Sequence, residues 1–108
     1  MLYISGNSIK LTRGDTAYLT VPLMCGDEEY KMGADDVLVL SLKEYTIDPK
    51  AVLRKEVKGE NTFHIKPEDT SGLTFGKYKY DIQLNAANGD VFTVIDVDTF
   101  EILQEVTC

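Results

Sequence analysis

The residues of this chain that could do chemistry are few and lie far apart. His64 is the only histidine, so a histidine-based metal site or a Ser-His-Asp arrangement would need a second base from elsewhere. Cys25 and Cys108 fall in a connecting segment and at the terminus, and no neighbouring base or helix start would activate Cys25 as a nucleophile. Two such thiols are typical of a reducing compartment rather than of a disulfide framework. We therefore predict a non-enzymatic protein without catalytic residues or a cofactor.

Acidic residues gather at 27–29 and 35–36, and at Asp96 with Asp98. Calcium needs about six to eight oxygen ligands, and none of these clusters has the spacing of a calcium-binding loop. We interpret them as solvated loop charge without a metal site. The net charge is -7, and no Lys or Arg follows Lys79. Because nucleic-acid affinity comes largely from clustered basic residues, we do not expect a nucleic-acid partner.

The segment 13–15 (Arg-Gly-Asp) matches the integrin-binding tripeptide. A glycine-based turn between two strands is the simpler interpretation, with Thr16 as the β-branched start of the second strand.

No apolar run approaches the roughly 20 residues that cross a bilayer, and Met1 is followed by a patterned segment without a secretory signal. At 108 residues the chain can form one domain with its own core. We predict a single domain, 1–108, that has no membrane partner.

The stretch 67–84 has the clearest local pattern, a helical turn that leads into a central strand. Pro67 suits the first helical position because its φ is fixed and its missing N–H would be unsatisfied there anyway. An acidic pair follows, where the helix dipole favours negative charge, and Gly72 ends the turn. From residue 77 the pattern has period two, which is typical of a strand with one solvated face. The residues predicted to face inward are Tyr78, Tyr80, Ile82 and Leu84.

Strand-like pieces recur along the rest of the chain, at 2–4, 9–11, 16–23, 37–43, 51–57, 62–65, 91–97 and 100–106. We predict that the chain opens with a small hairpin around 6–7 or with a strand that is kinked there, and that turns follow at 59–61 and 96–99. The dipeptide Asn88-Gly89 predicts a type I′ hairpin turn, because both residues tolerate positive φ. About eight short strands without an amphipathic helix indicate an all-β fold, an antiparallel β-sandwich with one helical turn near Pro67.

One strand and several tyrosines are candidates for an interface. The strand 37–43 is apolar on both faces, so its outward residues Val37 and Val39 are expected to lie under a loop or a partner chain. The segment 25–36 is a polar connection, anchored by Tyr30 and Met32. For the tyrosines of the chain, a core or interface role is favoured over carbohydrate stacking, since tryptophan is absent. The predicted interface residues are Val37, Val39, Tyr30 and Tyr45.

The run 76–80 (Gly-Lys-Tyr-Lys-Tyr), preceded by an acidic turn, resembles the E-to-F corner of immunoglobulin-like domains. The resemblance implies a structural corner of Gly76, Tyr78 and Tyr80, in which the hydroxyl of Tyr78 returns to the backbone a few residues upstream. The chain departs from antibody domains, because Tyr80 stands where they have a cysteine and no tryptophan is present. Only the immunoglobulin-like architecture is therefore implied.

A second resemblance covers most of the chain. The motif order 13–16 (Arg-Gly-Asp-Thr), 33–37 (Gly-Ala-Asp-Asp-Val), 67–70 (Pro-Glu-Asp-Thr), 76–82, 93–95 and 100–102 is similar to small β-sandwich domains of phage and prophage tails. The nearest family is the N-terminal domain family of siphophage baseplate upper proteins. It implies a structural role without catalytic residues. The partners would be other copies of the chain, in a homo-oligomer, or other tail or baseplate proteins.

That resemblance also implies a location, namely the bacterial cytoplasm during assembly and afterwards the virion or a tail-like particle.

A different function remains open from the residues alone. The loops 25–36 and 45–50 could form the binding site of a carbohydrate- or peptide-binding immunoglobulin-like module.

Overall fold

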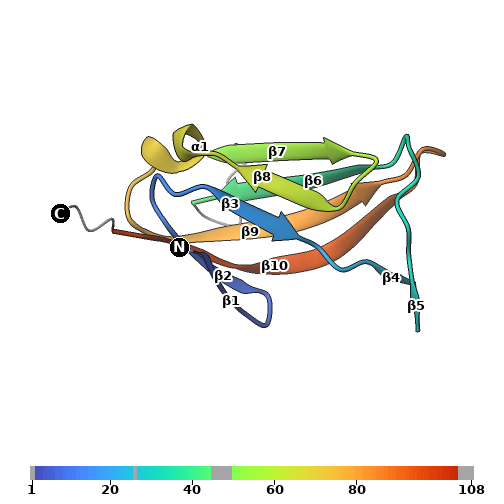
Figure 1. Ribbon diagram of the computed structural model, residues 1–108, viewed down its shortest axis with the longest axis horizontal. Helices are drawn as coiled ribbons and strands as arrows, with labels where there is room; N and C mark the ends of the chain where they lie inside the picture. The colour runs from blue at the N-terminus through green and yellow to red at the C-terminus, as the bar shows by residue number, and fades with distance from the viewer. Residues whose placement is uncertain (1, 26, 45–49, 105–108) are drawn as a thin grey trace.

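The computed structural model describes residues 2–25, 27–44 and 50–104. Nearly all of its regular structure is β-strand, and the all-β, sandwich-like fold confirms the predicted class (Figure 1). In chain order the elements are β1 (Leu2–Ser5), β2 (Ser8–Thr12), β3 (Ala17–Thr20), β4 (Met24–Cys25), β5 (Glu28–Glu29), β6 (Val37–Lys43), β7 (Leu53–Lys58), β8 (Thr62–Ile65), α1 (Pro67–Ser71), β9 (Gly76–Asn85) and β10 (Val91–Leu103).

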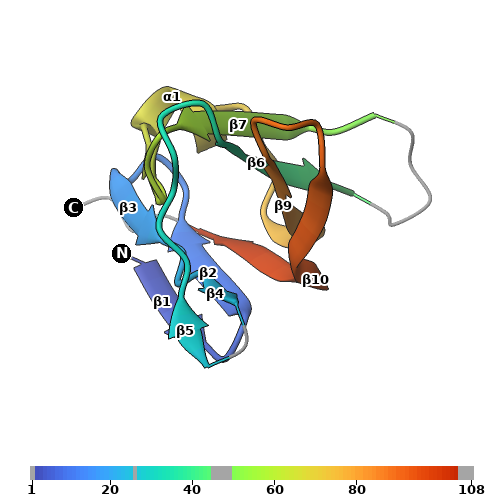
Figure 2. The ribbon, with the colours of Figure 1, turned by 90° about the vertical axis from the view of Figure 1, so that its right-hand side faces the viewer.

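Two sheets face each other across the core. The larger has the strand order β1-β2-β10-β9-β6-β7, and the smaller consists of β3 and β8. Figure 2 shows that the large sheet curls from β7 through β9 and β10 to β1, and that β3 of the small sheet lies on the open side of this curve. β10 runs parallel to β2, with Phe100 opposite Ile9, so the large sheet is mixed and the prediction of a purely antiparallel sandwich is wrong at this pair. Alternating residues identify a strand and its buried face, but not the direction of its neighbour.

The core is built from the inward positions of alternating strands. Tyr78, Tyr80, Ile82 and Leu84 are buried along β9, as predicted, while the residues between them are exposed or half-buried. Tyr80 packs edge to face against Phe100, with ring centroids 5.8 Å apart. The other buried apolar residues are Ile9, Leu11, Ala17, Leu19, Val21, Leu23, Leu38, Val39, Leu40, Leu42, Phe63, Ile65 and Ile102.

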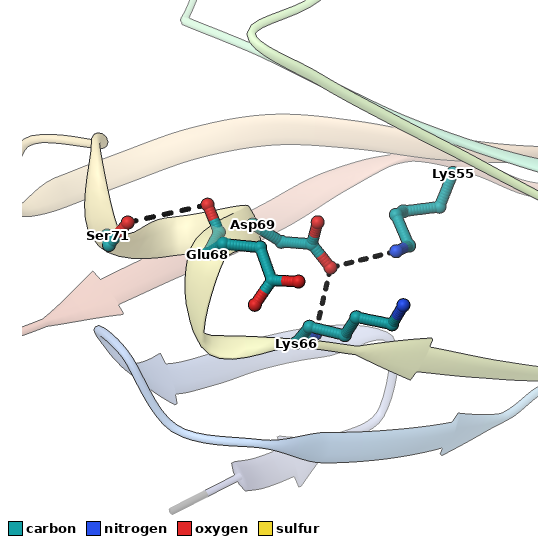
Figure 3. A network of polar contacts seen from close by, with 5 residues as sticks. All are labelled: Lys55, Lys66, Glu68, Asp69 and Ser71. Carbon is teal, nitrogen blue, oxygen red and sulfur yellow. Dashed lines mark hydrogen bonds and ion pairs between the residues drawn. The ribbon is translucent and has the colours of Figure 1, made fainter.

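The helical turn α1 begins at Pro67, as predicted, and is tied to β7 by a charged network (Figure 3). The carboxylate of Asp69 accepts hydrogen bonds from the backbone N–H of Lys66 and from Nζ of Lys55, both at 2.8 Å. Burial is the largest single influence on the pKa of Asp69 and opposes ionisation. The hydrogen bonds and positive charges of both lysines together outweigh it, so the pKa is lowered.

The Arg-Gly-Asp segment, 13–15, begins with the predicted turn after β2, and this turn is fixed against α1. The N–H of Gly14, whose φ is 83°, donates to the buried hydroxyl of Thr70 at 2.8 Å. The guanidinium of Arg13 donates to the carbonyl of Leu73 at 3.3 Å. These contacts give the segment a structural role that joins the end of β2 to the helical turn.

β9 and β10 form the predicted hairpin, but its loop is not a type I′ turn. The N–H of Ala86 donates to the carbonyl of Asp90 at 2.8 Å, and the N–H of Gly89 donates to the carbonyl of Ala86 at 2.9 Å. Gly89 has a φ of 95°, whereas no described residue other than glycine has a positive φ. This is the pattern of a three-residue loop, a type I turn followed by a glycine bulge. The side chain of Asn88 contributes by accepting the N–H of Asp90 at 3.0 Å.

β10 is one continuous strand, so the prediction of a turn at 96–99 is wrong. Its pairing with β9 shifts register between Thr93 and Ile95 and again between Ile95 and Asp98. At the bulges, the carboxylates of Asp96 and Asp98 accept the N–H of the following residue, at 2.8 and 2.7 Å. Aspartate side chains of this kind are common in turns, and here they satisfy backbone N–H groups within a bent strand.

Two further strand boundaries differ from the sequence prediction. The strand expected over 16–23 runs from Ala17 to Thr20, where its pairing with β8 ends. The segment 25–36, expected to lack regular structure, contains β5, which pairs with β4 in a short hairpin. Tyr30 and Met32 anchor this segment against the core, as predicted.

Candidate binding groove

The tyrosines of the predicted corner are structural. The hydroxyl of Tyr78 donates to the carbonyl of Thr74 at 2.8 Å. Gly76 lies between these two residues in sequence, has a φ of 135° and is the first residue of β9. The hydroxyl of Tyr80 donates to the carbonyl of Asn7, which ties β9 to the β1–β2 turn. Burial, assisted by the negative charge of Asp98, raises the pKa of Tyr80 to about 12. Both rings lie in the core and neither is available to a ligand.

The predicted interface on β6 is largely covered within the chain itself. Val39 is buried, although it points away from the core. It pairs with Glu56 of β7 and Gln83 of β9, whose longer side chains stand on the same face. The outward half of β6 therefore offers a partner little apolar surface, with Val37 half-buried. Tyr45 lies outside the described residues.

Asp36, which we had interpreted as solvated loop charge, is instead a buried hydrogen-bond centre. Its carboxylate accepts the hydroxyl of Tyr30 at 2.7 Å, the N–H of Gly33 at 2.9 Å and the N–H of Ala87 at 3.0 Å. These three donors, led by Tyr30, lower the pKa of Asp36 against the opposing effect of desolvation. The segment before β6 is thereby joined to the β9–β10 loop. Tyr30 thus has a structural bond at its hydroxyl.

An open groove lies beside Tyr30, at the end of the sandwich near the β9–β10 loop. It has a volume of about 540 Å³ and runs between the chain that leaves β3 and the first residues of β10. Its lining residues are Pro22, Leu23, Met24, Tyr30, Leu84, Phe92, Thr93 and Val94. The walls are mainly apolar, as the walls of ligand pockets usually are.

The groove is open because the smaller layer stops short of the end of the larger one. Phe92 pairs with the buried Leu84, and directly paired residues share one face of a sheet. Phe92 therefore lies on the core-facing side, yet it is 54% exposed. β3 has already ended at Thr20, and Met24, further along the opposite wall, is 61% exposed. Two large apolar side chains thus face solvent from the two walls of one groove.

Acidic residues are neighbours of the lining residues on both sides of the groove, and we call them its rim. Met24 pairs with Glu29, and the exposed Glu28 and Asp27 complete the β4–β5 hairpin on one side. The exposed Asp90 precedes β10 on the other. The exposed Lys31, which follows Tyr30 of the lining, is the one basic residue in the segment 24–36, against the four acidic residues of the rim. A ligand of this groove would therefore meet negative potential around an apolar floor.

The remaining candidates for chemistry do not form a cluster. His64 is exposed on β8 and stacks on Tyr18 of β3, with ring centroids 4.5 Å apart. Within the described ranges no three His, Cys, Asp or Glu side chains are placed to hold a metal ion. No helix among those residues is long and apolar enough to cross a membrane.

Comparison with known proteins adds no family, since no protein-family model, curated protein or solved structure matches the chain.

The groove was not predicted from the sequence. Phe92 has the period-two position of a core residue, and local alternation carries no information about whether the opposite layer reaches it.

Proposed function

We propose that this protein is a non-enzymatic assembly module that binds another protein through the apolar groove between Met24 and Phe92. The single observation that carries the proposal is Phe92, a core-facing aromatic side chain that the second layer leaves 54% exposed. Exposing a large apolar side chain on the inner face of a sheet is unfavourable in an isolated domain. The cost is recovered when a partner covers it, and aromatic residues are frequent at the centres of protein interfaces.

The setting proposed for this assembly is a phage or prophage tail, with a baseplate-like role, as the motif resemblance implies. The fold is compatible with an immunoglobulin-like sandwich, and the Tyr78 hydroxyl bond to Thr74 is the kind of contact found at a tyrosine corner. The location that goes with this proposal is the bacterial cytoplasm during assembly and then the tail-like particle. Its partners would be other copies of the chain or other tail proteins.

Co-expression with the proteins encoded by the neighbouring genes tests this function. Size-exclusion chromatography with light scattering should show a complex larger than the 12.1 kDa chain. The change Phe92→Asp should abolish the complex. The matched control Val52→Asp, at an apolar residue that is 42% exposed before β7, should leave it intact. A strict monomer in every combination, with neighbouring genes unrelated to virions, would overturn the proposal.

The second candidate is a carbohydrate- or peptide-binding module, and the observation that favours it is the ring of Tyr30 in the groove wall. Aromatic rings that line a groove can stack on sugars or cover apolar peptide side chains. An array of glycans should then give a reproducible ligand whose binding is lost in Tyr30→Ala. Tyr30→Phe, which keeps the ring and removes its bond to Asp36, separates stacking from structural effects. An array without a ligand argues against carbohydrate binding.

A further inference from the structure

One side of the first half of β10 lacks a neighbouring strand among the described residues. β9 pairs with β10 from Val91 to Ile102, with two register shifts between Thr93 and Asp98. On the opposite side, β2 pairs only with the last part, from Phe100 to Leu103. No other backbone hydrogen bond reaches residues 91–99 from the described parts of the chain. Unpaired strand edges of this kind can accept a strand from another chain.

The alternation of hydrogen bonds shows which groups of this edge are available. The N–H of Ala86 bonds to the carbonyl of Asp90 across the loop, so the next hydrogen-bonded pair of the antiparallel ladder is Phe92 with Leu84. The N–H and carbonyl groups of Val91 and Thr93 then point away from β9, toward the open side. Two residues offer about four backbone hydrogen bonds.

This edge opens into the apolar groove. Thr93 follows Phe92 in the strand, so its side chain is on the opposite face of the sheet. Thr93 nevertheless lines the groove. The groove therefore reaches the edge of β10 itself. A strand laid along this edge would place every second side chain against Phe92 and Met24. Beyond Thr93 the register shifts bend β10, which limits regular pairing to its first residues.

We infer that the groove binds an extended segment of another protein by strand addition to Val91 and Thr93, and that this segment has apolar residues at alternate positions and Lys or Arg at its ends. This inference rests on the proposed function and specifies its partner. The apolar side chains of one face of the added strand would fill the floor around Phe92. The basic end residues would lie near the carboxylates of Glu28, Glu29 and Asp90.

Charge favours a different protein over a second copy. Each copy has a net charge of -7 and no Lys or Arg after Lys79. Pairing β10 with β10 of another copy would bring the two acidic rims together, along with Asp96 and Asp98 of both strands. Like charges placed opposite each other destabilise strand pairs, whereas a basic segment relieves the negative potential of the rim.

The probe for this inference is a synthetic lysine–valine peptide of about nine residues, with valine at alternate central positions, threonine between them and lysine at both ends, so that its ends extend past the residues that pair with Val91 and Thr93. Titration of the ¹⁵N-labelled chain, followed by amide chemical shifts, gives its dissociation constant. Cross-strand contacts should appear from the peptide backbone to Val91 and Thr93. A glutamate–valine peptide of equal length should not bind. A lysine–valine peptide with alternate N-methylated amides should bind at least about 10-fold more weakly, because two or more hydrogen bonds are lost.

Two protein variants locate the binding. Phe92→Ser removes the apolar floor of the groove. Thr93→Pro removes the N–H that points away from β9, and an edge strand tolerates proline at such a position. Each change should weaken peptide binding by about 10-fold or more. Val52→Ser should not change it. If Thr93→Pro fails to fold, the N-methylated peptide still tests the edge with the unaltered protein.

The inference is overturned if the lysine–valine peptide does not bind, or if N-methylation leaves its affinity unchanged. A peptide that loses affinity with Phe92→Ser but tolerates N-methylation would refute strand addition while leaving the groove as a protein-binding site. Loss of the co-expressed complex in Phe92→Asp is a separate measurement, so the two proposals can fail independently.

Discussion

Replacing Phe92 by alanine should destabilise the fold much less than replacing Phe100, although both lie on the core-facing side of β10. Phe100 is fully buried and packs against Tyr80, so Phe100→Ala should cost about 3–5 kcal/mol. Phe92 is 54% exposed, so folding removes less than half of its surface from water. A fully buried side chain of this size contributes about 1.5–3 kcal/mol. Phe92→Ala should then cost about 1 kcal/mol, with no added cavity term because the site opens to solvent.

Urea unfolding followed by far-ultraviolet circular dichroism measures both changes, since the chain has no tryptophan to report by fluorescence. The two variants should keep the wild-type dependence on denaturant, so that the shift of the midpoint gives the free energy directly. In a thermal scan, a loss of 1 kcal/mol corresponds to about 4–8 °C in a domain of this size. Equal losses in Phe92→Ala and Phe100→Ala would mean that Phe92 is covered, and the groove and the function proposed for it would both be refuted.

Three further predictions concern the structural bonds around the groove and the corner. Tyr78→Phe removes the hydroxyl that donates to Thr74 and should lower the free energy of unfolding by about 1 kcal/mol; an unchanged urea midpoint would contradict this. Asp69→Asn removes the charge that pairs with Lys55 and should cost about 1–2 kcal/mol at neutral pH. Because the folded pKa of Asp69 is lowered, its contribution is complete above the unfolded value of about 3.9 and is lost as the pH falls through the folded pKa. The gap between wild type and Asp69→Asn should therefore close as the pH falls below the unfolded pKa and through the lowered folded pKa, and a gap independent of pH would refute the ion pair. The carboxyl of Asp36 should titrate below the usual aspartate range in carbon-detected NMR, with the amide of Ala87 moving at the same midpoint; an ordinary midpoint would show that the hydrogen bonds are absent.

The strands and their buried faces could be predicted because those features are local. A strand of a two-layer fold needs apolar side chains at every second position, and Tyr78, Tyr80 and Ile82 meet that need within a short stretch of sequence. Pro67 marks the helical turn for an equally local reason, its fixed φ. The same locality explains the wrong turn type at Asn88-Gly89, where the sequence allows two loops and the bulged form is adopted.

The features that define the site could not be read from local patterns. Asp35 and Asp36 are neighbours of identical type, yet only Asp36 is buried, because Tyr30 and Ala87 come close to its carboxylate in the folded chain. Val39 was expected to lie under a loop or a partner chain, but side chains of the strands on either side cover it. In each case the deciding neighbour is supplied by the tertiary fold.

The amino-acid sequence by itself determined where this chain forms strands, which side chains each strand turns inward and how acidic its surface is, because backbone geometry and charge are properties of neighbouring residues. Only the tertiary structure decided that β10 runs parallel to β2, that no described strand pairs with the outer edge at Val91 and Thr93 and that the described residues leave Phe92 half exposed. These outcomes depend on how far one layer extends over the other. The physical reason is that burial is a relation between segments distant in sequence, and a period-two pattern specifies a face without specifying what packs on it.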